Sequence, residues 1–216
     1  MATRPARPLI IAHRGVHACE RENSLAALEA AIAQTDGFET DLWRTADGTL
    51  VLAHDREAPD GRAIPTTGYH DLDAAYRRAG QKLATLDQLL AIADPAAWAC
   101  LELKAAGLAA EVFRSAWPIF GTRLRILSFE PAWFAGVPEA YCWLNIRDAS
   151  EIPGQRAGFV GLNARADAYP LGLAVPERAA WRVAPDQLPA LLADRVRYLI
   201  TDDPDPVRQA LDRLTR

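Results

Sequence analysis

Short apolar runs alternate with amphipathic patterns along most of this chain. Nine runs are short and rich in Leu, Ile, Val or aromatic residues, which predicts β-strands. Most are separated by segments with helical spacing, so the pattern predicts an α/β fold with a largely parallel sheet. The predicted strands are Leu9–His13, Gly37–Trp43, Thr49–His54, Cys100–Lys104, Arg123–Phe129, Tyr141–Ile146, Phe159–Asn163, Trp181–Val183 and Tyr198–Thr201.

Helix starts are marked by capping residues. Leu25, Leu28 and Ile32 share a helical face directly after Asn23-Ser24, a favourable N-terminal cap. Thr85-Leu86-Asp87-Gln88 has the sequence of a capping box. Further helices are predicted from Leu108 to Trp117, from Pro185 to Ala193, and from Asp203-Pro204 onward.

The number of strands favours a closed barrel. Thr45-Ala46-Asp47-Gly48 leaves no room for a helix, so Gly37–Trp43 and Thr49–His54 should form a hairpin. Leaving out one arm of this hairpin, eight of the nine strands remain for the barrel, as in a (β/α)₈ TIM barrel. A doubly wound open sheet is the alternative, and the absence of a GxGxxG loop weakens it. Residues 56–84 are turn-rich and predict a surface excursion near the site.

Composition narrows the class of protein. With 216 residues, 50% hydrophobic and 24% charged, the chain is expected to form a single globular domain over residues 1–216. A net charge of -4 with scattered basic residues argues against nucleic-acid binding. Cys19, Cys100 and Cys142 lie far apart without a CxxC, which favours neither zinc nor disulfides.

No membrane or export signal is evident in the sequence. The N-terminal apolar run is too short for a signal peptide, and no stretch approaches the roughly 20 apolar residues of a membrane span. We therefore expect a cytoplasmic protein without stable membrane insertion. The oligomeric state has no signal in the sequence.

The polar residues at the strand ends suggest a metal-assisted active site. His13 and His54 each end an apolar run. Glu39 and Asp41 stand two apart on a predicted strand, so both carboxylates project to one face and repel unless a cation lies between them. Glu102 adds a third carboxylate at another strand end. Oxygen ligands of this kind suit one divalent cation, Mg²⁺ or Ca²⁺.

Basic residues beside these acids suggest an anionic substrate. Arg14 and Lys104 could hold a phosphate group, with the guanidinium of Arg14 offering two parallel donors. A free imidazole titrates near about pH 6.5, which suits a pair of histidines acting as general acid and general base. Sequence does not assign the two roles. His17 and His70 are interpreted as loop histidines. His17 could also contact the catalytic residues without touching the substrate.

An ordered series of motifs resembles the glycerophosphodiester phosphodiesterase family from residue 9 to about residue 205. The resemblance implies a TIM-barrel hydrolase that cleaves a glycerophosphodiester, a small molecule, into glycerol 3-phosphate and an alcohol with one divalent cation. It implies His13 and His54 as the catalytic pair. It also implies Glu39, Asp41 and Glu102 as metal ligands. The motifs are His13-Arg14-Gly15, Glu22-Asn23-Ser24, Glu39-x-Asp41, Asp47-Gly48, His54-Asp55, Glu102-x-Lys104, Ser128-Phe129 and Thr201-Asp202-x-Pro204.

The sequence departs from the family pattern at two motifs. Arg21-Glu22-Asn23-Ser24 stands where the family usually has Pro-Glu-Asn-Thr. Trp181-Arg182-Val183-Ala184 stands where the family tends to have Trp-Thr-Val-Asn, so the resemblance does not extend to the glycerol or alcohol contacts. Phe129 and Trp181 fit a substrate wall and core packing equally well.

Two other functions remain open. A lysophospholipase D or sphingomyelinase D activity would use the same histidine pair and metal on a lipid headgroup. It needs an apolar surface at the barrel mouth, which the segment 132–137 could supply. A non-catalytic relative is the less favoured alternative, because every matching histidine and acid is present.

Overall fold

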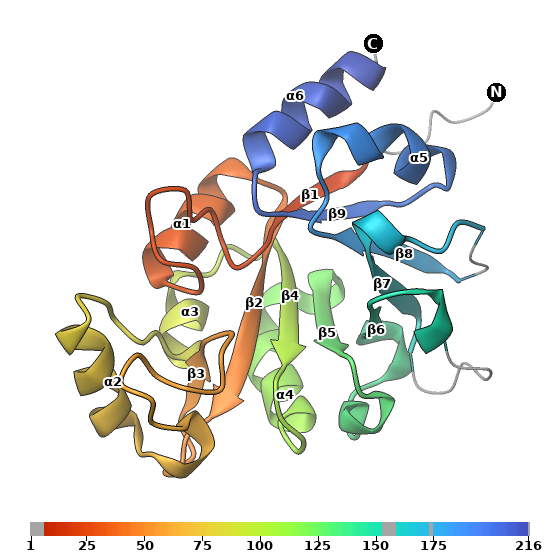
Figure 1. The fold of residues 1–216 in the computed structure, drawn as a ribbon. Coiled ribbons are helices and arrows are strands. Elements are labelled where there is room, and N and C mark those ends of the chain that lie inside the picture. Colours follow the sequence, from red (N-terminus) through yellow and green to blue (C-terminus); the bar gives the residue numbers. More distant parts are fainter. Residues whose placement is uncertain (1–6, 153–158, 173–174, 216) are drawn as a thin grey trace.

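Eight parallel strands close into a barrel, and a ninth strand extends it as a hairpin arm (Figure 1). The computed structural model describes residues 7–152, 159–172 and 175–215. β1 pairs in parallel with both β2 and β9, which closes the ring and rules out the open sheet. The strands are β1 (Leu9–Ala12), β2 (Gly37–Arg44), β3 (Leu50–Leu52), β4 (Trp98–Leu103), β5 (Leu124–Ser128), β6 (Cys142–Ile146), β7 (Gly161–Arg165), β8 (Glu177–Trp181) and β9 (Tyr198–Thr201).

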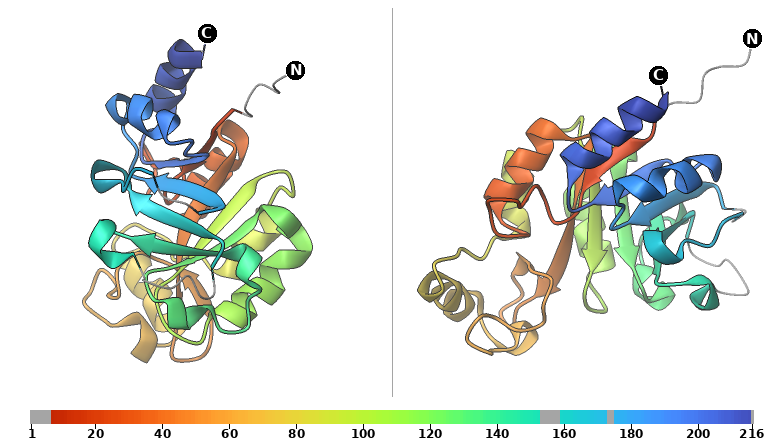
Figure 2. Two further views of the ribbon diagram at one scale, coloured as in Figure 1. Left: turned by 90° about the vertical axis from the view of Figure 1, so that its right-hand side faces the viewer. Right: turned by 45° about the horizontal axis from the view of Figure 1, so that its top comes forward.

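The helices cover the barrel unevenly (Figures 1 and 2). Within the described ranges, the connections from β5 to β8 contain only short 3₁₀ turns, whereas longer helices cover the remaining strands. The α-helices are α1 (Leu25–Gln34), α2 (Tyr69–Arg78), α3 (Leu86–Ile92), α4 (Ala109–Phe120), α5 (Leu188–Ala193) and α6 (Pro204–Thr215). The predicted helix at Pro185 starts as a 3₁₀ turn, Pro185–Gln187, before α5 begins.

The predicted caps form in the structure. The Ser24 hydroxyl accepts a hydrogen bond from the Ala27 amide at 3.2 Å and caps α1. At α3, Thr85 and Gln88 exchange reciprocal bonds of 3.2 and 3.0 Å. Each bond satisfies an amide that has no partner within its helix. These two helices therefore begin where the sequence pattern places them.

Strand alternation separates an apolar outer layer from a polar interior on β2. Phe38 and Leu42 are fully buried in the cluster between the barrel and its helices. Glu39 and Asp41 point the other way, into the barrel. Deeper in the barrel, Trp143 belongs to a separate buried cluster that fills the interior. This packed floor leaves the carboxyl ends of the strands as the place for a site.

The segment 56–84 contains a helix that the sequence interpretation missed. α2 buries Leu72 and Tyr76 in an apolar cluster with Val51 of the hairpin. The carboxylate of Asp47, in the hairpin turn, accepts a hydrogen bond from the Tyr69 amide at 3.0 Å and holds the start of α2. The excursion therefore packs on the hairpin near the carboxyl end of β2 (Figure 1).

The predicted strand Trp181–Val183 is wrong. The strand β8 runs from Glu177 to Trp181 instead. Arg182 has a φ of 58°, a left-handed conformation that ends the strand directly after the tryptophan. Trp181 and Val183 have a high strand propensity and a strong hydrophobic signal. The preceding Ala179-Ala180, which are fully buried in the barrel wall, have a weaker one.

Candidate active site

Three buried carboxylates meet inside the barrel at the ends of β2 and β4. Glu39 and Asp41 come from β2 and Glu102 comes from β4, where Asp41 and Glu102 are register partners. One oxygen from each carboxylate lies within 4.8 Å of the others. The structure thus brings together the three acids that the sequence predicted as a cluster, although they come from two separate strands.

Asn23 fixes the orientation of Asp41. Its side-chain amide donates to Asp41 Oδ2 at 2.9 Å, and its carbonyl oxygen accepts from the Asp41 amide at 3.1 Å and the Thr40 hydroxyl at 2.6 Å. Asn23 is fully buried with a φ of 57°, a conformation that asparagine tolerates better than most residues. The residue therefore holds a metal-ligand candidate as well as preceding the cap of α1.

The His13-Arg14-Gly15 turn brings the first strand against α1. Gly15 has a φ of 85°, and a Cβ there would lie 2.6 Å from the carbonyl carbon of Ala27. The next amide, of Val16, donates to the Ala27 oxygen at 2.9 Å. Glycine is required here both by conformation and by space.

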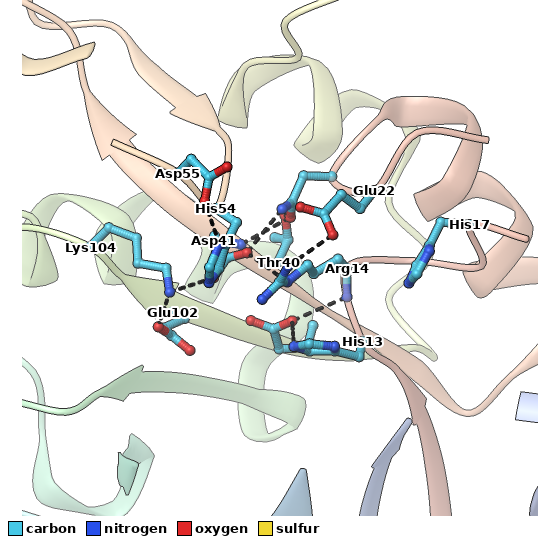
Figure 3. Close-up of polar contacts among 12 residues, drawn as sticks. His13, Arg14, His17, Glu22, Thr40, Asp41, His54, Asp55, Glu102 and Lys104 are labelled. Atoms are coloured by element: carbon cyan, nitrogen blue, oxygen red, sulfur yellow. Dashed lines mark hydrogen bonds and ion pairs between the residues drawn. The ribbon is translucent and has the colours of Figure 1, made fainter. Parts of the chain in front are cut away.

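Two cations approach the acids from different sides (Figure 3). The Lys104 ammonium lies 2.9 Å from Asp41 Oδ1 and also contacts Glu102 Oε1. Arg14 Nε lies 3.3 Å from Asp41 Oδ2, and the Arg14 backbone amide donates to Glu39 Oε2 at 3.1 Å. The guanidinium also pairs with Glu22 at 2.8 Å. Both cations predicted to hold phosphate therefore border the acid cluster.

The acids have different pKa shifts because their partners differ. Burial, followed by the nearby charges of Asp41 and Glu102, raises the pKa of Glu39 well above its ordinary value. Burial and the Asp41 charge also raise the pKa of Glu102. Burial acts to raise the pKa of Asp41 too, but the charges of Lys104 and Arg14 outweigh it and lower that pKa.

The donor set fits a hard divalent cation. Glu39 Oε1 is buried and has no hydrogen-bond partner among the described residues, which is costly for a carboxylate oxygen. When all three acids are ionised, they carry more negative charge than Arg14 and Lys104 offset. A cation with oxygen ligands would supply both the missing partner and the missing charge.

Each candidate catalytic histidine has an aspartate on its Nδ1 atom. His13 Nδ1 lies 2.6 Å from Asp202 Oδ1, and His54 Nδ1 lies 2.9 Å from Asp55 Oδ1. The His13 side chain is 9% exposed and the His54 side chain 38%. His13 Nε2 lies 3.8 Å from Glu39 Oε2. A carboxylate on Nδ1 leaves Nε2 of each ring for proton transfer.

Asp202 is a site residue to which the sequence interpretation assigned no role. The hydrogen bond from His13 lowers the pKa of Asp202 below its ordinary value. Arg182 Nε approaches its other carboxylate oxygen at 3.3 Å, and His17 lies 3.6 Å from Oδ1. The motif Thr201-Asp202-x-Pro204 was the available signal for this residue.

A cavity of about 400 Å³ joins these groups. Phe129 and Trp181 line it and meet edge to face at a centroid distance of 6.0 Å, so both reach the pocket. Trp133 also lines it and belongs to the segment 132–137, which was considered as an apolar surface at the barrel mouth, whereas Asn163 lines it and was not predicted. His70 lies on α2 and is not among the lining residues. The predicted residues in the lining are His13, Arg14, Glu39, His54, Glu102, Lys104, Phe129 and Trp181.

Sequence comparison supports the motif-based resemblance. A model of the glycerophosphoryl diester phosphodiesterase family matches residues 13–104. Curated relatives from two strains of Mycobacterium tuberculosis, described as probable glycerophosphodiester phosphodiesterase 1, are 46% identical over 50 residues. That stretch is 23% of this chain and 18% of each relative.

Solved structures show the same fold over nearly the whole chain. A glycerophosphodiester phosphodiesterase from Parabacteroides distasonis has a TM-score of 0.78 at 23% identity, covering 97% of this chain and 100% of its own. An enzyme of that name from Thermotoga maritima has a TM-score of 0.74 at 21% identity, with coverages of 97% and 99%.

A third structure contains a small-molecule product. It is an Oleispira antarctica phosphodiesterase in complex with the product sn-glycerol-3-phosphate, with a TM-score of 0.75 at 21% identity and coverages of 95% and 97%.

Across the described ranges of the present structure, the helices are too short or too polar to cross a bilayer. The chain resembles the glycerophosphodiester phosphodiesterase family in the sequence of residues 13–104 and in the fold of nearly its whole length.

Proposed function

We propose that this protein is a metal-dependent glycerophosphodiester phosphodiesterase that releases glycerol 3-phosphate and an alcohol. The observation that carries the proposal is the buried acid cluster with an unpartnered Glu39 oxygen, placed in one cavity with two aspartate-paired histidines. The product bound to the Oleispira antarctica relative supports a small phosphodiester as the substrate class.

The acids and the basic side chains have different electrostatic roles: the acids bind the metal, and the basic side chains bind the phosphate. Glu39, Asp41 and Glu102 would hold one Mg²⁺ or Ca²⁺, which when bound polarises a non-bridging phosphate oxygen. The Arg14 guanidinium and the Lys104 ammonium border the same cavity. They attract the anionic diester and stabilise the negative charge that grows on phosphate during the reaction.

The histidines move the protons. One removes a proton from the nucleophile, which is either water or the neighbouring glycerol hydroxyl that forms a cyclic phosphate. The other donates a proton to the leaving alkoxide. Asp202 and Asp55 hold the Nδ1 side of His13 and His54, so proton exchange with substrate uses Nε2.

Hydrolysis of soluble diesters tests this proposal. Glycerol 3-phosphate release would be measured for a panel of glycerophosphodiesters, with EDTA and after Mg²⁺ or Ca²⁺ is restored. Release that needs the cation is expected, and His13→Ala or His54→Ala should abolish it. His70→Ala is the matched control, since His70 is exposed on α2. Release unaffected by EDTA, or full activity of a folded histidine variant, would contradict the corresponding role.

A lysophospholipid is the second candidate substrate. Trp133 joins Phe129 and Trp181 in the cavity lining, so aromatic side chains are available to an acyl chain. Co-sedimentation with lysophosphatidylcholine-containing vesicles separates the two cases. No binding to vesicles together with turnover of soluble diesters would favour the first substrate class.

A further inference from the structure

A line of polar side chains runs across the barrel interior from the acid cluster to β7. Asn145 Nδ2 donates to Glu102 Oε2 at 2.9 Å, and Asn163 Nδ2 donates to Asn145 Oδ1 at 3.0 Å. Asn145 and Asn163 are register partners on β6 and β7, and each is only 2% exposed. The line ends at Asn163, which borders the cavity.

The carboxylate at one end sets the direction of every bond in the line. Glu102 contacts the Lys104 ammonium and, as a carboxylate, only accepts hydrogen bonds. Asn145 must therefore present its NH₂ group to Glu102 and its carbonyl oxygen to Asn163. Asn163 in turn must present its own NH₂ group to Asn145. This ordering leaves the carbonyl oxygen of Asn163 as the free end.

That free oxygen lacks a partner. Asn163 Oδ1 is buried and accepts no hydrogen bond from the part of the chain that the structure describes. A buried carbonyl oxygen without a donor is destabilising, because no hydrogen bond offsets its loss of hydration. Because the side chain borders the active-site cavity, a ligand in that cavity can supply the donor.

The surroundings of Asn163 suit a polyol. β7 lies across the closed barrel from β2, which carries Glu39 and Asp41. The aromatic pair Phe129 and Trp181 lines the same cavity. A ligand with its phosphate at the acids and cations would extend carbon atoms past these rings. It would then meet an acceptor that a hydroxyl group satisfies and a methyl group does not.

We propose that Asn163 Oδ1 accepts a hydrogen bond from a hydroxyl group of the glycerol moiety and thereby selects glycerol phosphates over phosphates of simple alkanols. This inference rests on the proposed function and names a specificity-determining residue for the same site. The Glu102–Asn145 contact determines that the carbonyl oxygen of Asn163, and not its NH₂ group, is left without a partner. Apolar replacement of Asn163 should therefore remove discrimination without removing phosphate binding.

Binding of product analogues tests the assignment without involving turnover. The dissociation constants of sn-glycerol 3-phosphate and propyl phosphate would be measured by calorimetry on the full chain with saturating Mg²⁺. The two ligands share the phosphate and the three-carbon chain and differ only in the hydroxyl groups. We expect the wild type to prefer glycerol 3-phosphate about 10- to 100-fold. Asn163→Ala and the larger Asn163→Leu should reduce this ratio to about threefold or less while retaining the affinity for propyl phosphate.

The outcomes separate the inference from the proposed function. A wild-type ratio below about threefold, in a protein that hydrolyses glycerophosphodiesters, would overturn the role of Asn163 alone, whatever the variants do. An unchanged ratio in either folded variant would also overturn it, with the oxygen then assigned to an ordered water. Failure to bind either phosphate, together with no hydrolysis, would overturn the proposed function and this inference with it.

Discussion

Replacing Asp202 with asparagine tests whether the carboxylate on His13 contributes to turnover. Asp202 Oδ1 lies 2.6 Å from His13 Nδ1, with side-chain exposures of 32% and 9%. Asparagine keeps the shape of the side chain but has no negative charge, and its amide can present either a donor or an acceptor to the ring. The substitution therefore removes both the charge and the control of which ring nitrogen carries the proton.

The expected loss follows from the strength of this bond. A hydrogen bond to a charged group contributes about 1.5–3 kcal/mol. Because nearly one third of the Asp202 side chain is exposed, solvent screens part of it, and we take about 1.5–2.5 kcal/mol. If this energy acts in the transition state, kcat should fall about 10- to 70-fold. KM should change less than about threefold, since Asp202 is not among the residues that line the cavity.

Steady-state kinetics with saturating Mg²⁺ and the preferred glycerophosphodiester provide the measurement. Asp203→Asn is the matched control because Asp203 is exposed and its carboxylate has no hydrogen bond or ion pair with other described residues. Long-range ¹H–¹⁵N spectra of the histidine rings would report the tautomer of His13 in each variant. A folded Asp202→Asn protein with kcat within twofold of the wild type would show that this carboxylate has no role in the reaction.

Three further predictions concern stability. Lys104→Met should lower the free energy of unfolding by about 3–5 kcal/mol in EDTA, because it removes the ammonium that contacts the buried carboxylates of Asp41 and Glu102. Urea unfolding with added Mg²⁺ should show a smaller loss. Glu177→Gln should lower the free energy of unfolding by about 2–3 kcal/mol, because it breaks the buried ion pair with Arg125. It should leave kcat within twofold, since this pair lies at the amino ends of the strands. An unchanged free energy of unfolding would contradict the prediction. Since the folded pKa of Asp202 is lowered, its stabilisation is present above the unfolded value near about 3.9 and disappears as pH falls toward the folded value. The difference in unfolding free energy between wild type and Asp202→Asn should therefore shrink below about pH 4, and a difference that stays constant there would refute this linkage.

The barrel could be predicted because its strands have strong local patterns. β1 and β9 are continuous apolar runs, and the turn at Asp47-Gly48 identifies the hairpin. The position of β8 was predicted wrongly because its buried residues are alanines, which carry little hydrophobic signal. The Trp-Arg-Val sequence has a stronger strand pattern, but its arginine has a left-handed backbone conformation that ends the strand. α2 was missed because it is polar overall and lies between turn-forming residues, and only its contacts with the hairpin show which face is buried.

Some residues of the candidate site could likewise be predicted from local sequence, and others only from the structure. Glu39 and Asp41 could be predicted as neighbours because two residues on one strand share a face. The contact between Asp202 and His13 joins residues 189 positions apart, and a motif without geometry does not indicate which side chain it meets. For Asn163 the only signal was its position as the one polar residue of the predicted strand Phe159–Asn163. Its unpartnered oxygen became visible only when β6 and β7 were placed side by side.

The raised pKa of Glu39 leads to a prediction that links pH, metal and stability. In the metal-free protein, burial and the charges of Asp41 and Glu102 favour the protonated form of this carboxyl. The unfolded chain releases that proton above about pH 4.5, so between this value and the raised folded pKa the folded state binds more protons. Stability contributed by this group must then fall as pH rises through the window.

A divalent cation should reverse this dependence, because metal ligands must be deprotonated and a bound ion stabilises only the folded state. Urea unfolding from pH 4.5 to 8 would be compared for wild type and Glu39→Gln, in EDTA and in excess Mg²⁺ or Ca²⁺. The wild type in EDTA should lose stability relative to the variant as pH rises, and the stabilisation by metal should grow over the same range. Glu39→Gln should flatten both trends, since its amide neither titrates nor neutralises the ion. Identical pH profiles for the two proteins in EDTA would show that Glu39 is ionised in the metal-free fold. With that result, the electrostatic case for cation binding beside Glu39 would fail.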